Sequence, residues 1–218
     1  MSEEAERKVR KRAAPKFIDR ETVISAVLEM FSTRGFHGAS MRQIAAAAST
    51  SLSNLYNYFE SKDELLEFVL ENTARALADQ LEAAVAEAGD DPADQLEAAV
   101  RSYVDFIVDQ PQASTVGITE FRYLQGANRA EVVAQRDRTE ATFRRAIEAG
   151  AASGAFSVAD IGVATRGTVT LCNSMSTWYR PDGRLSRSEL ADLQADLVLG
   201  LVRAQRRAVP GQPSAGAR

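Results

Sequence analysis

Three serines between residues 40 and 61 limit the fold more than any other feature of this chain. Ser40, Ser51 and Ser61 each stand in the position of a helix N-cap, directly before a segment of helical composition. Gln43 follows Ser40 at the spacing of a capping box, and the same spacing recurs after Ser61. Helices that begin so close together are short and pack at steep angles. The segment therefore predicts a helix-turn-helix, with its second helix over residues 52–59.

This second helix has two apolar positions for the core, Leu55 and Phe59, and is otherwise rich in polar side chains. Hydroxyl and amide groups bond base edges and phosphates in the major groove of DNA. The polar side chains are Ser53, Asn54, Tyr56, Asn57 and Tyr58. The pattern favours a module that reads duplex DNA. A second interpretation stays open for the two tyrosines, as partly buried aromatics that pack a small domain.

Charge is divided unevenly along the chain, although its formal net charge is only −4. Residues 7–62 contain ten Lys and Arg against four Asp and Glu, whereas the chain from residue 63 onward contains sixteen against twenty-three. DNA phosphates attract the first region and repel the second. The division predicts that only the helix-turn-helix region approaches nucleic acid.

Composition excludes several other classes of protein. One cysteine, Cys172, and one histidine, His37, cannot form a disulfide, a common zinc site or a Ser-His-Asp triad. We expect Cys172 to be a core residue and His37 to lie at the surface, with no catalytic residue, metal or cofactor. No apolar run reaches membrane-spanning length, and we expect no signal peptide. A cytoplasmic bacterial protein without a membrane partner is expected, associated with the nucleoid when bound to DNA.

Helical periodicity extends over the rest of the chain, and no strand-like alternation of useful length interrupts it. A first amphipathic helix starts near Asp19 and ends near Gly35. The later helices are predicted over 61–88, 93–109, 112–124, 127–151, 158–178 and 187–207. The fold class is thus all-α with about nine helices, a three-helix N-terminal domain and a larger C-terminal bundle.

Four regions follow from this pattern. Residues 1–16 form a flexible basic arm, which either touches the DNA backbone or minor groove or acts only as a solubilising tail. Residues 17–62 form the helix-turn-helix domain, and residues 63–208 form a domain for ligand binding and dimerisation. Residues 209–218 form a disordered tail.

The helix-turn-helix block, with the helix before it, resembles the amino-terminal domain of TetR-family transcriptional regulators. The residues that match are Ala26, Phe31, Gly35, the runs 40–45 (SMRQIA) and 55–59 (LYNYF), and the run 61–66 (SKDELL). The resemblance implies a homodimeric repressor whose C-terminal domain binds a small inducer. Binding of the inducer would change the spacing of two DNA-reading heads.

Carried over by position, the resemblance implies a set of DNA-binding residues. They are Arg42, Leu52, Ser53, Asn54, Tyr56, Asn57, Tyr58 and Lys62, of which Lys62 would hold a phosphate. The turn departs from the family pattern, because Ser49 and Thr50 stand where glycine and an aliphatic residue are usual. The departure predicts a turn that is strained or capped differently.

The effector is expected to bind in an apolar pocket with a few polar anchors. The candidate residues are Phe106, Glu120, Phe121, Arg122, Arg166, Thr170, Asn173 and Trp178. Residues 178–185 are similar to a stretch in TetR-family regulators of fatty-acid and steroid catabolism, which makes an acyl-CoA or another lipid-like metabolite the leading hypothesis. Core packing is the alternative for each aromatic residue.

Small residues in the last two helices, such as Gly162, Gly167, Ala191, Ala195 and Gly200, predict a close-packed four-helix contact between two subunits. Two further classes remain open. A non-specific architectural DNA-binding protein would have little reason to keep an acidic C-terminal half. An enzyme built on a helical bundle would need a metal-ligand cluster or a nucleophile beside a base, and the sequence offers neither.

Overall fold

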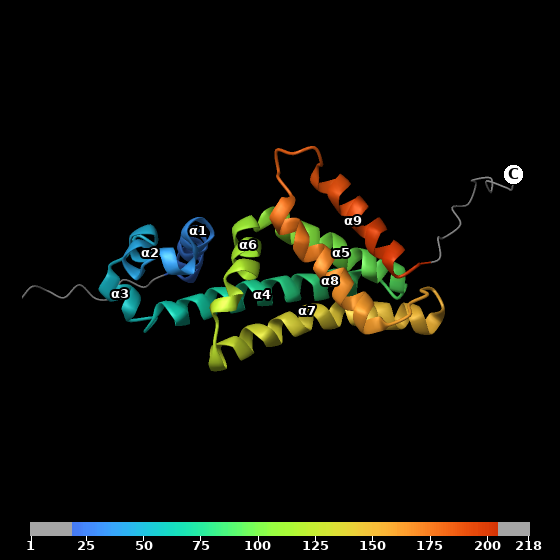
Figure 1. Ribbon diagram of the computed structural model, residues 1–218, viewed down its shortest axis with the longest axis horizontal. Helices are drawn as coiled ribbons and strands as arrows, with labels where there is room; N and C mark the ends of the chain where they lie inside the picture. Colours follow the sequence, from blue (N-terminus) through green and yellow to red (C-terminus); the bar gives the residue numbers. More distant parts are fainter. Residues whose placement is uncertain (1–18, 205–218) are drawn as a thin grey trace, which may run out of the picture.

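The computed structural model describes residues 19–204, apart from the side chains at positions 127 and 128 (Figure 1). Within this range the chain folds into nine α-helices and one short 3-10 helix, without a strand, so the predicted all-α class is confirmed. The helices are α1 Arg20–Gly38, α2 Met41–Ala47, α3 Leu52–Tyr56, α4 Lys62–Glu87, α5 Pro92–Asp109, α6 Pro111–Thr119, η1 Phe121–Tyr123, α7 Gly126–Ser153, α8 Ile161–Trp178 and α9 Arg187–Leu201. The predicted basic arm and C-terminal tail lie outside the described residues.

The three serine caps are present. The side chain of Ser40 accepts from the Gln43 N–H and completes a capping box, while Ser51 and Ser61 accept from the backbone three residues later at 3.1 Å. Caps of this kind each contribute about 0.5–2 kcal/mol to stability. Helices as short as α2 and α3 depend on such caps because they have few intrahelical hydrogen bonds.

Two predicted boundaries differ from the structure. The second helix of the motif ends at Tyr56, because the N–H groups of Asn57 and Tyr58 bond to carbonyls three residues back and tighten the last turn. The helix predicted over 112–124 ends at Thr119 and continues as η1 after Glu120. This break turns Glu120 toward α1 and Phe121 toward α7, contacts that no local pattern in the sequence reports.

Two buried apolar clusters form the core, and α4 belongs to both. Its first half places Leu65, Leu66 and Val69 in a cluster with α1, α2 and α3, and its second half places Leu81 in a cluster with α5, α7, α8 and α9. With 26 residues, α4 is about 39 Å long and runs along the molecule from one cluster to the other (Figure 1). Because the first cluster also contains Val116 of α6, the helix-turn-helix is packed onto the larger domain.

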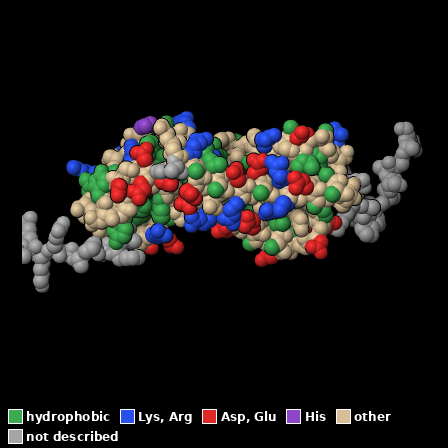
Figure 2. All heavy atoms as spheres, turned by 90° about the horizontal axis from the view of Figure 1, so that it is seen from below, with side chains coloured by type: hydrophobic (Ala, Val, Ile, Leu, Met, Phe, Trp, Pro, Cys, Tyr) green, Lys and Arg blue, Asp and Glu red, His purple; other side chains and the backbone are tan. Residues whose placement is uncertain are grey.

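The long helices α4 and α7 lie side by side. Arg138 of α7 forms ion pairs with Asp79 and Glu82 of α4, each at 2.7 Å. The face seen in Figure 2 carries acidic and basic side chains interspersed along the molecule. Exposed ion pairs of this kind contribute little stability individually, so the apolar clusters hold the helices together.

The turn between α2 and α3 carries the strain that its departure from the family pattern predicts. Ser49 has φ 52°, in the left-handed region that favours glycine, and its side chain is exposed. A non-glycine residue held there costs on the order of 1–2 kcal/mol.

Ser49→Gly is expected to stabilise the protein by about 0.5–1 kcal/mol, because the relieved strain exceeds the entropy that glycine adds to the unfolded chain. Urea unfolding followed by circular dichroism measures the change. Ala46→Gly, at an exposed helical position of α2, is the control and should cost about 1 kcal/mol. A loss of stability in both variants would contradict the strain at Ser49.

Candidate nucleic-acid interface and effector cavity

The outer side of α2 and α3 carries most of the side chains expected to bind DNA. Ser53, Tyr56 and Asn57 recur at i, i+3 and i+4, which places them on one side of α3. All three are exposed, as are Arg42 on α2 and Tyr58 just after α3. Tyr56 and Tyr58 are 48% and 42% exposed, so about half of each side chain is open to a partner. On the opposite side the two helices bury their apolar residues in the first cluster, as predicted.

Asn54 and Leu52 point elsewhere. Asn54 is only 8% exposed, and its Nδ2 donates to Thr50 Oγ1 at 2.9 Å, so it braces the turn instead of facing a groove. Leu52 is half-buried against the first apolar cluster. Both expectations for direct base contact therefore need correction. Asn54 is buried beside Leu55 on the side of α3 that faces its own domain, and Leu52 packs against the same cluster.

Lys62 also differs from its expected role. Its Nζ donates to the carbonyl oxygens of Phe36 at 2.7 Å and Ala39 at 3.0 Å, and lies 4.4 Å from the centroid of the Phe36 ring. These carbonyls are at the end of α1, where a helix lacks intrahelical partners and favours a cation. In the structure Lys62 ties α4 to α1, and its ammonium group does not extend toward a phosphate.

The joint between the helix-turn-helix and the larger domain is centred on Phe36. Gly35 has φ 69° and breaks the helical ladder of α1 just before it. The N–H of Phe36 donates to Glu120 Oε2 at 2.8 Å, and its ring stacks on Tyr123 at 5.5 Å. Glu120 is buried at 5% exposure, so this hydrogen bond is shielded from water. Glu120 is therefore a contact between domains, and its expected role as an effector anchor is corrected.

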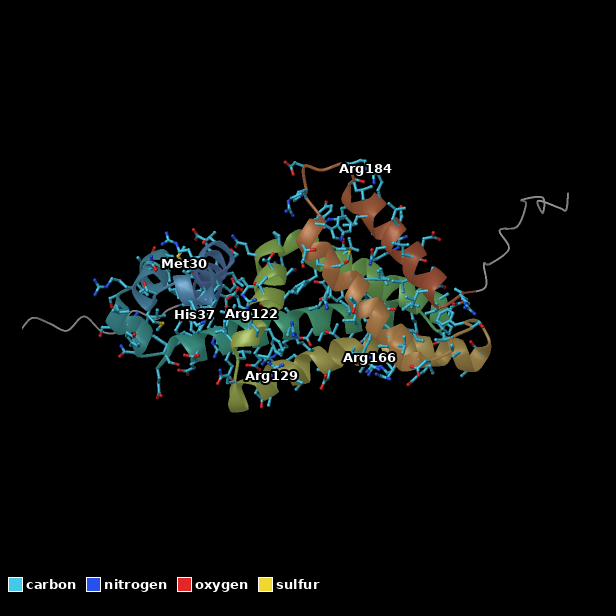
Figure 3. All side chains as sticks on the ribbon, viewed as in Figure 1. Met30, His37, Arg122, Arg129, Arg166 and Arg184 are labelled. Carbon is cyan, nitrogen blue, oxygen red and sulfur yellow. The ribbon has the colours of Figure 1, made fainter. Side chains whose placement is uncertain are left out.

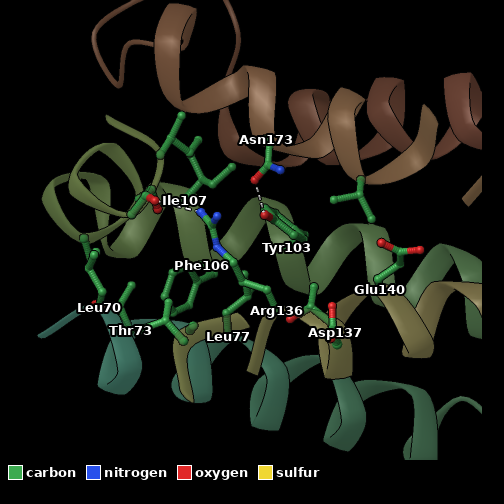
Figure 4. Close-up of a pocket in the computed structure, with 18 residues that line it drawn as sticks. Leu70, Thr73, Leu77, Tyr103, Phe106, Ile107, Arg136, Asp137, Glu140 and Asn173 are labelled. Carbon is green, nitrogen blue, oxygen red and sulfur yellow. Dashed lines mark hydrogen bonds between the residues drawn. The ribbon is translucent and has the colours of Figure 1, made fainter. Parts of the chain in front are cut away.

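A cavity of about 220 Å³ lies between α4, α5, α6, α7 and α8 (Figure 4). Apolar side chains line most of it, among them Leu70, Leu77, Phe106 and Ile107. The polar side chains include Tyr103, Arg136 and Asn173. The composition matches that of small-molecule sites, which are mostly apolar with a few polar groups.

One polar pair in the cavity is fixed by a hydrogen bond. The hydroxyl of Tyr103 donates to Asn173 Oδ1 at 2.5 Å, shown by a dashed line in Figure 4. Burial raises the pKa of Tyr103, so the phenol keeps its proton at neutral pH. Phe106 and Asn173 are thus the two expected effector residues that the structure places at the cavity.

Five further expected effector residues lie away from the cavity. Phe121 is in η1, with the guanidinium groups of Arg129 and Arg136 over its ring, and Arg122 is exposed against Tyr123. Arg166 (Figure 3) and Thr170 are exposed on α8, and Trp178 at the end of that helix is 49% exposed. The inward side of α8 is taken by Thr165, Thr168, Cys172 and Met175, so positions 166 and 170 face outward.

Arg136 and Tyr103 were not predicted from the sequence as cavity residues. Tyr103 fits an amphipathic helix as ordinary core. Arg136 is one of several arginines in a long charged helix, and nothing in its sequence neighbourhood separates it from Arg138, which is on the surface. Cys172, by contrast, is fully buried as predicted, and burial raises the pKa of its thiol to about 12.

An exposed apolar strip runs along α8 and α9. Leu193, Leu197 and Leu201 follow one another at i, i+4 and i+8 on α9, with exposures of 50%, 58% and 39%, and Val163 on α8 is 66% exposed. The small residues Ala191 and Ala195 are instead buried in the core of their own subunit. The expected outward role of these alanines is thus corrected.

Neither a metal site nor a membrane span is found in the described part of the chain. Among residues 19–204, no group of three or more His, Cys, Asp or Glu side chains is arranged to hold a metal ion. No helix in the same range is long and apolar enough to cross a membrane.

Two family models match the chain. The model described as "Tetracyclin repressor-like, C-terminal domain" matches residues 89–202, more than half of the chain. The model described as "Bacterial regulatory proteins, tetR family" matches residues 23–69, which include the α2–α3 motif.

Individual relatives agree with these models. The HTH-type transcriptional regulator UidR of Escherichia coli (strain K12) is 40% identical over 60 residues, which cover 27% of this chain and 31% of UidR. The match thus spans about a third of that relative's length. The crystal structure of the TetR family regulator PfmR from Thermus thermophilus is 26% identical, with a TM-score of 0.75 and coverage of 87% of this chain and 100% of that chain.

A second structure, AibR in complex with isovaleryl coenzyme A and operator DNA, is 22% identical with a TM-score of 0.76. The aligned region covers 85% of this chain and 98% of the AibR chain. At this identity the likeness shows the fold alone.

The Glu120–Phe36 hydrogen bond generates a stability prediction. Glu120→Leu is expected to lower the free energy of unfolding by about 1–3 kcal/mol, because it leaves the buried Phe36 N–H without an acceptor. Glu120→Gln keeps a carbonyl oxygen at the same distance from the backbone. Its free energy of unfolding should therefore fall by less than half of the decrease in Glu120→Leu. Urea unfolding measures both variants, and equal losses would show that the hydrogen bond is not what stabilises the joint.

Proposed function

This chain belongs to the TetR family of bacterial regulatory proteins, and on that premise we propose that it is a ligand-responsive transcriptional repressor. It binds a palindromic DNA operator as a homodimer and acts in the cytoplasm, at the nucleoid. A small apolar or acyl-CoA-type effector releases it from DNA. The observation that carries the proposal is the polar outer side of α3, joined through Phe36 to the segment beside the cavity.

The DNA contacts are assigned to the exposed side chains. Arg42, Ser53, Tyr56, Asn57 and Tyr58 are the residues that bind bases and phosphates in the major groove. The side chains behind this surface support it through the hydrogen bonds that fix α1 and the turn. A short recognition helix held by caps and buried hydrogen bonds is pre-organised for binding.

The dimer is assigned to the apolar strip of α8 and α9. A row of leucines at i, i+4 and i+8 fits the seam of a four-helix contact between two copies of the chain. One head with a five-residue recognition helix reads few base pairs, so two heads related by a two-fold axis would read a palindrome.

Coupling between effector and DNA is assigned to α6 and η1. Helix α6 contributes Ser114 and Gly117 to the cavity wall and packs against α1. Immediately after it, Glu120 and Tyr123 hold Phe36. A displacement of α6 by the effector would move α1 and the recognition helix with it. A coupling of roughly 1–3 kcal/mol is typical of such systems.

The acyl-CoA hypothesis has support from the AibR complex, which contains isovaleryl coenzyme A. An acyl chain would fit among the apolar side chains of the cavity. The segment 178–185, which suggested this class of effector, lies between α8 and α9 and does not line the cavity.

Footprinting on the promoter region of the protein's own gene tests the function. The wild-type protein is expected to protect a short palindrome, and Arg42→Ala or Tyr56→Phe should weaken that binding by about 1–3 kcal/mol if each contacts bases. Arg145→Ala, which changes an exposed arginine on α7 outside both the α2–α3 surface and the α8–α9 strip, is the control and should bind as the wild type does. Sequence-independent binding would instead identify an architectural DNA-coating protein, and turnover of a bound ligand would identify an enzyme.

Leu197→Glu tests the dimer. Burial of one leucine contributes about 1.5–3 kcal/mol, and the symmetric contact contains it twice, so dimerisation should weaken at least roughly 100-fold. Analytical ultracentrifugation measures the dissociation constant. Ser188→Glu adds the same charge to α9 about 140° around the helix from Leu193 and serves as the control. A dimer unaffected by Leu197→Glu would place the interface elsewhere.

A further inference from the structure

Arg136 is held at the wall of the cavity by two contacts. It is half-buried on α7, and its Nη2 donates to the carbonyl oxygen of Gly117 in α6 at 2.7 Å. Its guanidinium carbon lies 3.9 Å from the centroid of the Phe121 ring. Figure 4 shows Arg136 among the residues that line the cavity. A carbonyl and an aromatic ring fix its direction without neutralising its charge.

No carboxylate of the described residues forms an ion pair with Arg136. Asp137 and Glu140 also line the cavity, but Asp137 is exposed and Glu140 pairs with Arg144 at 2.7 Å. Arg138, two residues along the same helix, pairs with two carboxylates. Burial lowers the pKa of Arg136, yet a guanidinium stays charged at neutral pH. A partly desolvated cation is costly unless an anion pairs with it.

Other polar groups at the cavity favour the same kind of ligand. The hydroxyl of Ser114 in α6 is buried and bonds to none of the described residues, so a rotation of its side chain would provide a donor. Asn173 accepts from Tyr103 through Oδ1, which leaves its amide N–H groups as donors. Arg136, Ser114 and Asn173 thus offer N–H or O–H donors around one cavity. Such a set suits a ligand group that only accepts hydrogen bonds, such as a carboxylate.

The size of the cavity limits the rest of the ligand. Its volume of about 220 Å³ is roughly one and a half times the 150 Å³ or so of an apolar protein cavity that binds benzene. The enclosed group is thus about the size of a short acyl chain or one aromatic ring. The nucleotide part of coenzyme A would have to remain outside.

We propose that the effector is a small amphipathic acid, whose carboxylate pairs with Arg136 while its short apolar group packs among Leu70, Leu77 and Phe106. This inference deepens the proposed function and rests on it. Of the two effector classes named there it selects the small, mostly apolar molecule, and it adds a free carboxylate that the neutral thioester of an acyl-CoA lacks.

The same contact explains how the acid would act on DNA binding. A carboxylate that accepts two parallel N–H bonds along one edge of the guanidinium, with Nη2 as one of the donors, competes with the Gly117 carbonyl for Arg136. Loss of that hydrogen bond detaches α6 from α7. Because α6 leads directly to Glu120, the release reaches the joint at Phe36.

The test compares acids with their neutral amides of the same shape. Phenylacetate with phenylacetamide, and hexanoate with hexanamide, are titrated into the full-length protein by isothermal calorimetry. In each pair the acid is expected to bind at least roughly tenfold more tightly, as charge-assisted pairs do relative to neutral ones. Arg136→Met should abolish this preference, and Arg136→Lys should keep part of it, since a charge remains without the paired geometry.

Arg129→Met is the matched control. Arg129 also stacks on Phe121, at 4.2 Å, but is exposed and does not line the cavity, so its loss should leave the acid preference intact. Thermal unfolding of each variant separates binding from folding. A purely structural Arg136 would lower the melting temperature in Arg136→Met and leave the preference unchanged, which overturns the proposal.

Three other results also overturn it. They are equal binding of acid and amide by the wild type, no binding of either acid at millimolar concentration, and tight binding of butyryl-CoA that Arg136→Met leaves unaffected. Footprinting without any probe reports on the proposed function separately. Protein that prefers acids but protects no DNA would contradict the regulator and not the acid site.

Discussion

The backbone N–H of Phe36, bonded to the buried carboxylate of Glu120, is the contact on which the arrangement of the two domains depends. Gly35 adopts a left-handed conformation and ends the regular helix, so this N–H is turned toward the larger domain. Lys62 donates to the carbonyl oxygen of the same residue, and Tyr123 covers its ring. Backbone groups buried without a partner cost about 1–3 kcal/mol each, so these contacts act together to hold one orientation.

The segment from Gly117 to Tyr123 belongs both to the cavity and to this joint. Gly117 accepts from Arg136 at the cavity wall, Phe121 supports the same arginine, and Glu120 and Tyr123 face the helix-turn-helix. A ligand that changes the position of Arg136 therefore acts on residues only a few peptide units from the joint. The break between α6 and η1 is what allows neighbouring residues to face opposite partners.

Sequence patterns located the elements better than they located the sites. Period-3.6 spacing and serine caps predicted the helices, and Leu55 and Cys172 were recognised as core because apolar side chains on one side of a helix have few alternatives. Polar residues are ambiguous by the same reasoning. The side chains of Asn54 and Tyr56 could both bind in a DNA groove. In the structure, however, Asn54 bonds to Thr50 in the turn before α3, whereas Tyr56 points toward solvent. Composition does not distinguish a polar group that faces solvent from one that closes a turn.

The amino-acid pattern alone established that the chain is helical and that a cationic capped motif precedes an anionic bundle, while the family resemblance marked Ser49 as a position where glycine is usual. These properties are local, because caps, periodicity and backbone strain involve residues within about one helical turn. Which charges meet a partner depends on how the helices pack. Lys62 pairs with carbonyls 26 and 23 residues away, Glu120 with an N–H 84 residues away, and Arg136 lines a cavity without a carboxylate partner among the described residues. Helix packing brings together residues that are far apart in the sequence, and it also buries their charged groups. A buried charge costs free energy unless a partner in the protein or a ligand pairs with it.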